Sequence, residues 1–441
     1  MRVTLDQILS LGGCEVACGP IDGVSVEGAG VDSRHVVPGE LFVGVRGEHD
    51  DGGRHAPDAL RAGAAAAVVG EDAWAQIAAE AEALGRPVLV AADPVALLGA
   101  AGRLALARLG ARVVGVTGSY GKTTTKDIVV AMLRAAGARA EGTPGNRNTE
   151  IGVPLALLGL PEGTEVAVVE MGMRGTGQIA ELAALAPPDV ACITSVGPVH
   201  LELLGTVEAV AAAKAEILGA LRPGGAAVVP AGDALLAPHL ATLDPGVRLY
   251  EFGDRPDLDL DLSLRKGWEL RNAAAALACC RALGRAPAPG ARVEVALSAM
   301  RGQERPLPGD GVLIEDCYNA NPPSMRAALA DLAGRGGRRV AVLADMMELG
   351  PDETAFHREV GAEAARLGID LLVAVGRRAR GYAEGAGGVD ALYFPTVDEA
   401  VAGVPGHIRP GDAVLVKGSR SMAMERVAAA ILDDGAGCPG S

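Results

Sequence analysis

Apolar residues along this chain follow two alternating patterns. In the first pattern, mostly apolar residues rich in Val and Ala stand in a short continuous run. In the second, apolar residues recur every three or four positions over a longer stretch. Continuous runs are typical of strands buried on both faces of a parallel sheet, and the wider spacing is typical of helices that cover such a sheet. The alternation therefore predicts an α/β fold. Before residue 305 the clearest runs are residues 65–69, 113–116, 165–169, 189–196 and 226–229.

The alternation divides the chain into three parts. Residues 1–96 predict a small α/β domain that begins with a helix capped by Thr4. Residues 97–304 predict a central domain with a parallel sheet. Residues 305–441 predict a second, Rossmann-like sheet with right-handed crossovers, because strands and helices alternate regularly there. A length of 441 residues agrees with about three domains. In the last domain, strands are expected at 312–315, 339–343, 371–375 and 413–416, with helices at 323–332, 353–367, 377–384 and 421–432.

The stretch 113–126, VVGVTGSYGKTTTK, carries the strongest chemical signal. A β-branched run, a glycine-rich loop, a Lys-Thr pair and a helical pattern form the phosphate-binding unit of nucleotide-binding α/β proteins. Loop N–H groups and the helix N-terminus face the phosphates, the lysine adds a positive charge, and a threonine hydroxyl can bind Mg²⁺. An ordinary glycine turn before a helix is the alternative. We therefore expect a P-loop, ATPase-like central domain whose ATP-binding residues include Gly118, Ser119, Gly121, Lys122, Thr123 and Thr124.

Polar residues follow the ends of several predicted strands. Glu170 ends the strand expected beside the phosphate-loop strand, where a carboxylate can bind the Mg²⁺ of a nucleotide. His200 follows the next strand at the same sheet edge. In the last domain, Asp316 and the segments 318–322 and 417–420 follow strands in the same way. Two such edges facing each other would form a cleft. The spacing alone gives Lys214 no role beyond that of a solvated lysine on a helix.

Composition and charge exclude several classes of function. A net charge of −15 argues against a nucleic-acid partner, which needs a basic face. The seven cysteines are scattered and predict no disulfide framework. The N-terminus lacks the pattern of a signal peptide, and no window of about 18 apolar residues predicts a membrane span. We expect a cytoplasmic monomer.

Taken together, these stretches resemble the Mur ligase family over nearly the whole chain. The motifs that carry the resemblance are GVTGSYGKTTTK, GNRNTEIGVPLALL, VVEMGMRGTGQIAELA, GPVHLELLG with AKAEIL, EDCYNANPPSM, ADMMELG and VLVKGSRSM. The YNANP, DMMELG and KGSR stretches are similar to the branch that adds D-Ala-D-Ala to UDP-N-acetylmuramoyl-tripeptide. The resemblance implies an ATP-dependent amide ligation through an acyl phosphate, with two Mg²⁺ ions. Positioning and charge stabilisation dominate the catalysis of such a transfer.

The resemblance also implies roles for individual residues. Lys122 would contact the β- and γ-phosphates, Thr123 and Glu170 the first Mg²⁺, and His200 the second. Lys214 matches a carbamylated lysine of the family. The resemblance therefore replaces the interpretation of Lys214 as a solvated lysine. Nucleotide contacts are implied for Asn272, Arg305, Asp316 and Asn319. Substrate contacts are implied for Ser33, Arg34, Asn146, Asn148, Thr149, Asn321, Lys417, Ser419 and Arg420.

Four stretches depart from the family pattern: residues 51–55, Gln178, the shortened segment 252–272, and Leu270-Arg271 before Asn272. Two alternatives stay open. One is a sibling amide ligase, such as the diamino-acid-adding Mur ligase or folylpolyglutamate synthase. The other is a nucleotide-binding regulator that does not ligate. A regulator predicts a damaged metal site, whereas here the residues with implied phosphate and metal roles are all present.

Overall fold

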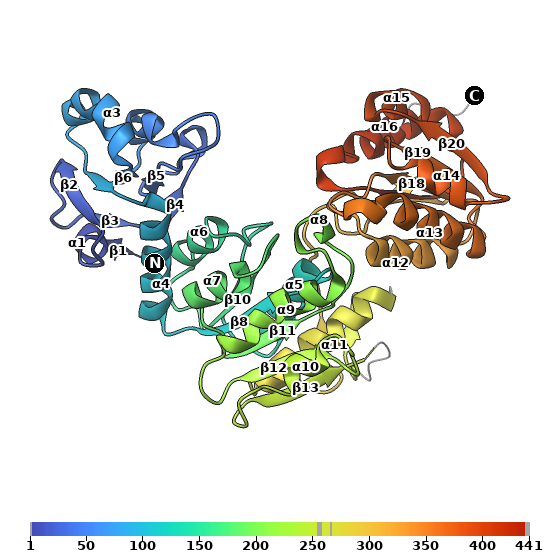
Figure 1. Cartoon of the computed structure of the whole chain (residues 1–441), viewed down its shortest axis with the longest axis horizontal. Helices are drawn as coiled ribbons and strands as arrows, with labels where there is room; N and C mark the ends of the chain where they lie inside the picture. Colours follow the sequence, from blue (N-terminus) through green and yellow to red (C-terminus); the bar gives the residue numbers. More distant parts are fainter. Residues whose placement is uncertain (1, 254–257, 265–266, 437–441) are drawn as a thin grey trace.

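The computed structural model describes residues 2–253, 258–264 and 267–436. Three α/β domains follow one another along the chain, and the central domain lies between the other two (Figure 1). This architecture confirms the three-domain α/β fold that the sequence predicts. Among the residues so described, no helix is long and apolar enough to cross a membrane.

The N-terminal domain is built on a five-stranded sheet in the order β2-β7-β6-β5-β4. β2 runs antiparallel to β7, and the other neighbours are parallel. Thr4 caps the first helix through a capping box with Gln7, which confirms the predicted start of that helix. The elements are β1 (Val3–Thr4), α1 (Leu5–Leu9), β2 (Cys14–Cys18), β3 (Ser25–Val26), β4 (Ala29–Gly30), η1 (Ser33–His35), β5 (Leu41–Val43), η2 (Gly52–His55), α2 (Ala56–Arg61), β6 (Ala66–Val69), α3 (Glu71–Leu84) and β7 (Val88–Ala91).

Helix α4 (Pro94–Leu109) joins the N-terminal domain to the central domain. It lies so close to α6 (Gly152–Leu158) that a Cβ on Gly102 would lie 2.9 Å from the Cα of Pro154. One apolar cluster runs through this junction, from the strands of the N-terminal sheet across α4 to Leu155 and Leu158. The domain boundary that the sequence places at residue 96 falls inside α4.

The central sheet has six parallel strands in the order β13-β12-β11-β8-β10-β9. Val114 packs under α5 and α11, whereas its neighbour Val113 packs under α6, α7 and α9. Both faces are covered, which explains the continuous apolar runs. The elements are β8 (Arg112–Thr117), α5 (Lys122–Ala135), β9 (Ala140–Gly142), β10 (Val166–Glu170), α7 (Gln178–Leu185), β11 (Val190–Ile193), α8 (Leu201–Leu204), α9 (Val207–Gly219), β12 (Ala226–Pro230), α10 (Ala237–Leu240), β13 (Arg248–Phe252), β14 (Asp261–Leu262), α11 (Gly267–Ala282) and β15 (Arg292–Val293).

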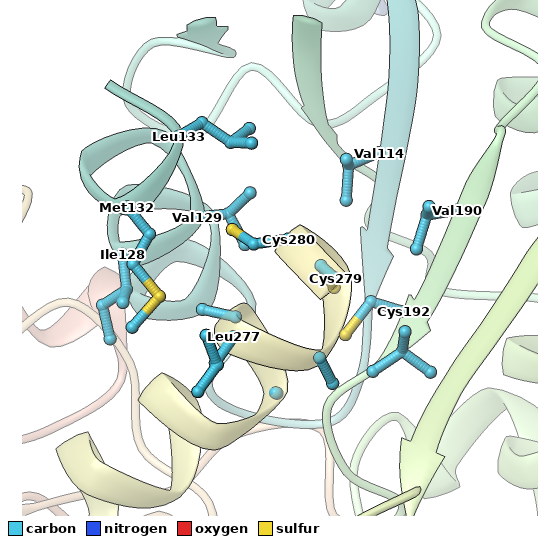
Figure 2. Packing of buried hydrophobic residues seen from close by; sticks show 14 of the residues in the cluster. Val114, Ile128, Val129, Met132, Leu133, Val190, Cys192, Leu277, Cys279 and Cys280 are labelled. Carbon is cyan, nitrogen blue, oxygen red and sulfur yellow. The ribbon is translucent and has the colours of Figure 1, made fainter. Parts of the chain in front are cut away.

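Helices α5 and α11 pack on each other and on the central sheet (Figure 2). Met132 and Leu133 of α5, Cys279 and Cys280 of α11, and Cys192 of β11 are buried in this cluster. Much of the α11 side consists of alanines, whose small side chains let the two helices approach closely. All cysteines among the described residues are free, and burial raises the pKa of the Cys280 thiol to about 12.

The C-terminal sheet has six strands in the order β16-β17-β21-β18-β19-β20, all parallel except β16. The sequence does not predict β16 and β20, because these edge strands carry exposed residues instead of an apolar run. The boundary placed at 304/305 falls inside β16. The elements are β16 (Gln303–Leu307), β17 (Gly311–Asp316), α12 (Pro322–Ala333), β18 (Arg339–Ala344), η3 (Gly350–Asp352), α13 (Glu353–Arg366), β19 (Leu371–Val375), α14 (Arg380–Gly385), β20 (Asp390–Phe394), α15 (Val397–Gly403), η4 (Pro405–His407), β21 (Ala413–Lys417), η5 (Arg420–Met422) and α16 (Glu425–Ala436).

Candidate active site

The phosphate loop connects β8 to α5, as the sequence predicts. Gly118 has a φ of 151°, and a Cβ at this position would overlap Oγ1 of Thr194. The end of β11 holds the loop in place, because the Tyr120 N–H donates to Ser195 Oγ at 2.9 Å and the Gly197 N–H donates to Ser119 Oγ at 3.0 Å. The residues after β11 therefore lie directly beside the loop.

Lys122 lies over this loop at the start of α5. Its ammonium donates to the carbonyl oxygen of Gly118 at 2.8 Å. Burial lowers its pKa, the nearby Glu170 carboxylate opposes that shift, and Arg301 adds to it. The loop N–H groups, the α5 N-terminus and this ammonium together suit a polyphosphate.

Glu170 ends β10 beside the loop and is only 2% exposed. Thr123 Oγ1 donates to its Oε2 at 2.7 Å, and Asn148 Nδ2 donates to its Oε1 at 2.7 Å. A carboxylate and a hydroxyl at the outer edge of a nucleotide loop are ligands that Mg²⁺ prefers. Nowhere in the described ranges do three or more His, Cys, Asp or Glu side chains gather as a metal cage. The donor set therefore fits an ion completed by phosphate oxygens, as is usual for Mg²⁺.

His200 precedes α8 with a left-handed backbone, φ 53°. Its Nδ1 lies 2.5 Å from Oε2 of Glu348, which comes from the C-terminal domain. Arg174 Nε lies 3.7 Å from the other oxygen of the same carboxylate. The hydrogen bond with His200 holds the pKa of Glu348 below its usual value. The structure thus places His200 beside a partner that the sequence reasoning did not assign.

Lys214 is 2% exposed on α9, so the solvated lysine that spacing alone suggests is wrong. Burial sets its pKa well below the usual value, and the positive charge of Lys122 lowers it further. The apolar neighbours of this helix explain the burial, because α9 covers the central sheet on the side opposite α5. No local signal in the sequence distinguishes Lys214 from a surface lysine.

Asn272 lies in α11 and meets the phosphate loop. It is 6% exposed, and a Cβ on Gly121 would lie 2.5 Å from its Oδ1. Gly121 has a φ of 82°, which suits glycine. The preceding residue, Arg271, donates from Nη1 to the hydroxyl of Tyr120 at 3.1 Å. Although the segment before it is short, α11 therefore brings two polar residues to the loop.

The structure brings Arg301 to the phosphate loop, whereas Arg305, for which the resemblance implies a nucleotide contact, lies on an edge strand. Arg301 Nη2 donates to Thr123 Oγ1 at 3.0 Å, and its guanidinium lies 3.7 Å from the centre of the Tyr318 ring. Arg305 is exposed on the edge strand β16, opposite Leu313 of β17. The two arginines are four positions apart in the sequence. Arg301 precedes β16 and Arg305 lies within it, and the sequence does not predict this strand.

Other predicted residues divide into two groups in the C-terminal domain. Asn321 caps α12, and its Nδ2 lies 3.4 Å from the carbonyl oxygen of Ser119, so it reaches the phosphate loop. Lys417, which is 2% exposed, donates to Asp316 Oδ2 at 2.6 Å and to the carbonyl oxygen of Asn319 at 2.9 Å. Lys417, Asp316 and Asn319 therefore form a group of their own at the carboxyl edge of this sheet.

The hydroxyl of Ser419 is also engaged, because it accepts a hydrogen bond from the Met347 N–H at 3.0 Å. Arg420 is exposed and pairs with Glu425 at 2.7 Å. Burial raises the pKa of the Tyr318 phenol, and a hydrogen bond with the side chain of Asn146 opposes part of that shift. Thr149 Oγ1 accepts from the Gly152 N–H at the start of α6.

Ser33 and Arg34 lie in the N-terminal domain and are not brought to the phosphate loop. Arg34 donates from Nε and Nη2 to the carboxylate of Asp32, each at 2.8 Å, and these hydrogen bonds hold the pKa of Asp32 far below its usual value. Arg34 is exposed and Ser33 is half-buried. Their domain and the C-terminal domain lie on opposite sides of the central domain (Figure 1).

Three family models match consecutive parts of the chain. They are described as "Mur ligase family, catalytic domain" for residues 25–115, "Mur ligase middle domain" for 116–264 and "Mur ligase, glutamate ligase domain" for 300–420. The order of these matches is that of the three domains of the structure, and the boundary between the first two matches falls inside β8.

Whole proteins match as well. The UDP-N-acetylmuramoyl-tripeptide--D-alanyl-D-alanine ligase of Synechocystis is 36% identical over 421 residues, which cover 91% of both chains. Among solved structures, MurF from Acinetobacter baumannii has a TM-score of 0.84 at 28% identity, over 98% of this chain and 99% of that one. MurF ligase from Thermotoga maritima, solved in complex with ADP, has a TM-score of 0.76 at 28% identity, over 93% and 98%. With the site geometry described above, these matches show that the chain belongs to the Mur ligase family.

Proposed function

We propose that this protein is an ATP-dependent ligase that joins D-Ala-D-Ala to UDP-N-acetylmuramoyl-tripeptide in the synthesis of peptidoglycan precursors. The observation that carries the proposal is the intact group of Lys122, Thr123 and Glu170 around the phosphate loop, in a chain whose relatives bear that name. The non-catalytic alternative predicts the loss of at least one of these three side chains.

The reaction then has two steps. The terminal carboxylate of the tripeptide attacks the γ-phosphorus of ATP, so that an O–P bond forms and the bond to the β-phosphate oxygen breaks, releasing ADP. The free amine of D-Ala-D-Ala attacks the carbonyl carbon of the acyl phosphate, a C–N bond forms, and phosphate leaves after the amine has lost a proton. Lys122, the loop N–H groups and Arg301 stabilise the negative charge on the phosphates during the first step.

Magnesium would be held by Thr123, Glu170 and His200, and it supplies charge neutralisation at the phosphate oxygens when bound. Lys214 would become a carbamate. A lysine amine attacks CO₂ only in its neutral form, and the burial that lowers the pKa of Lys214 favours that form. The reaction forms an N–C bond and releases one proton, which leaves an anionic group in place of the amine.

For the nucleotide we assign Asn272 and Arg301 to direct contacts, with Asp316 and Asn319 held near the ribose by Lys417. Arg420 is the exposed member of the KGSR stretch and would meet the peptide end of the substrate. Ser33 and Arg34 would bind the UDP part, with Asn146, Asn148 and Thr149 on the central domain. We infer that the protein acts as a cytoplasmic monomer.

The test is ATP-dependent phosphate release with UDP-N-acetylmuramoyl-tripeptide, with D-Ala-D-Ala in one reaction and single amino acids in another. Release with the dipeptide alone is expected, and Lys122→Ala should reduce it by about 100-fold or more. Release with a single amino acid would instead assign the protein to a sibling ligase. No release with any amine, despite binding of ADP, would refute the proposal.

A further inference from the structure

The C-terminal domain contacts the central domain at His200 through a loop that the chemistry above does not use. This docking loop, residues 345–350, follows β18 and carries Glu348. Glu348 Oε2 lies 2.5 Å from Nδ1 of His200, and Glu348 Oε1 lies 3.7 Å from Arg174 Nε. Figure 1 shows α8, which His200 precedes, at the junction of the two domains.

The backbone on both sides of this contact is unusual. His200 has a φ of 53° and Glu348 a φ of 62°, and both are non-glycine residues in the left-handed region. Each such residue costs about 1–2 kcal/mol and persists only where its surroundings hold it, which is most often at functional sites. Here the two residues contact each other across a domain junction.

Two further features fix the docking loop. Gly350 has a φ of 72°, and a Cβ there would lie 3.3 Å from the backbone N of Glu202 and 3.4 Å from the carbonyl carbon of Leu201, so the loop lies directly against α8. On its other side, the Ser419 N–H donates to the carbonyl oxygen of Asp345 at 3.2 Å, and the Met347 N–H donates to Ser419 Oγ. Glu348 is therefore presented by a loop held at both ends.

The contact has a direct chemical consequence for the imidazole of His200. An ionised carboxylate only accepts hydrogen bonds, so the nitrogen that faces Glu348 carries the proton. In the neutral imidazole the other nitrogen, Nε2, then keeps its lone pair, which is the form that binds a metal ion. His200 follows Gly197 by three residues, and Gly197 is hydrogen-bonded to Ser119 of the phosphate loop.

We propose that Glu348 is a positioning residue, which fixes the tautomer and the orientation of the His200 ring. Because Glu348 comes from the C-terminal domain, the metal-binding side of the active site is then complete only when that domain is docked. This inference rests on the proposed function, because it gives His200 the role of a metal ligand. It adds a residue from a different domain to that role. An ion pair that only joins two domains is the simpler alternative.

The first measurement is the tautomer of His200 in the full chain, read from long-range ¹H–¹⁵N spectra of protein labelled at its seven histidines. The signal of His200 is identified by its loss in His200→Gln. We expect a protonated Nδ1 in the unsubstituted protein, the same tautomer in Glu348→Gln, whose amide oxygen still accepts, and a mixture of tautomers in Glu348→Ala. An unprotonated Nδ1 in the unsubstituted protein would overturn the proposal without any variant.

The second measurement is Mn²⁺ binding in the presence of ADP, followed by electron paramagnetic resonance. Loss of a group that orients a metal ligand costs about 10- to 100-fold in affinity, so Glu348→Ala should weaken Mn²⁺ binding by that factor. Glu384→Ala is the matched control, because Glu384 pairs with Arg358 at 2.7 Å and is 41% exposed, against 38% for Glu348. It should change Mn²⁺ binding less than twofold.

A lower melting temperature of Glu348→Ala with unchanged tautomer and unchanged Mn²⁺ affinity would assign Glu348 to a structural role and refute the inference. Neither measurement uses the tripeptide or the dipeptide. Failure of the proposed function would therefore appear in the phosphate-release assay, and failure of this inference would appear in the spectra.

Discussion

Gly121→Ala is the substitution whose effect on nucleotide binding follows most directly from the structure. Gly121 has a φ of 82°, and the new Cβ would lie 2.5 Å from Oδ1, 3.3 Å from Cγ and 3.4 Å from Nδ2 of Asn272. A carbon and an oxygen do not approach to 2.5 Å, so the Asn272 side chain must turn away. Asn272 is only 6% exposed, so turning its side chain moves a buried amide out of its present position beside the phosphate loop.

Two energetic costs contribute to the expected effect of Gly121→Ala on stability and on ADP affinity. The left-handed backbone costs about 1–2 kcal/mol for a residue other than glycine, and this term lowers stability. Displacing a buried polar group costs about 1–3 kcal/mol, and this cost falls on Asn272, which is assigned to a nucleotide contact. At about 1.4 kcal/mol for each tenfold change, the second term predicts an ADP affinity about 5- to 150-fold weaker.

Isothermal titration with ADP and Mg²⁺ measures this change. Gly110→Ala is the matched control, because Gly110 has a φ of 61° and no atom within 4 Å of its Cβ position. It carries the backbone cost alone and should leave ADP affinity unchanged. The double variant Gly121→Ala/Asn272→Ala should lose less affinity than the sum of the single losses, since both act on one side chain. Additive losses, or equal affinities for Gly121→Ala and Gly110→Ala, would refute the reasoning.

Four other parts of the structure give further predictions. Arg301→Ala should weaken ADP binding about tenfold, whereas Arg305→Ala should leave it unchanged in the same titration, because only Arg301 contacts Thr123. Met132→Ala should destabilise the chain by about 2–5 kcal/mol, seen as a lower unfolding midpoint in urea, because Met132 is fully buried. Lys214→Ala should abolish phosphate release, and short carboxylates should restore part of it; no restoration at any concentration would argue against the carbamate. Burial raises the pKa of Asp345 in the folded state. The contribution of Asp345 to stability is therefore complete below the unfolded pKa and is lost as the pH rises through the folded pKa. When urea unfolding is compared from pH 4 to pH 7, Asp345→Asn should lack this loss of stability.

Much of the fold follows from local pattern. The run that becomes β8, the glycines of the loop and the periodic positions of α5 are all present within 113–133, so the phosphate site follows from contiguous residues. The Thr4 cap is equally local. The edge strands β16 and β20 do not follow, because a strand with one solvated edge needs no apolar run, and its existence depends on the neighbour with which it pairs.

The same distinction separates the site residues. Thr123 and Glu170 meet because β8 and β10 are adjacent parallel strands, which the α/β pattern predicts. Lys214 is buried by the packing of α9, and Glu348 reaches His200 across a domain junction, so neither contact leaves a trace in local spacing. The contact of Arg301 with the phosphate loop is also not predictable from local spacing, because the position of Arg301 depends on where β16 begins.

The two junctions of the central domain differ in chemistry, and this difference assigns them different mechanical roles. At α4 the junction is a continuous apolar core with helices in close contact, so the N-terminal and central domains cannot separate without exposing that core to water. The C-terminal domain meets the phosphate loop and His200 through polar contacts, such as Asn321 Nδ2 with the carbonyl oxygen of Ser119 and Glu348 with His200, which water can replace. We therefore expect any hinge motion of this chain to centre near residue 300, where the C-terminal domain begins, and not at α4.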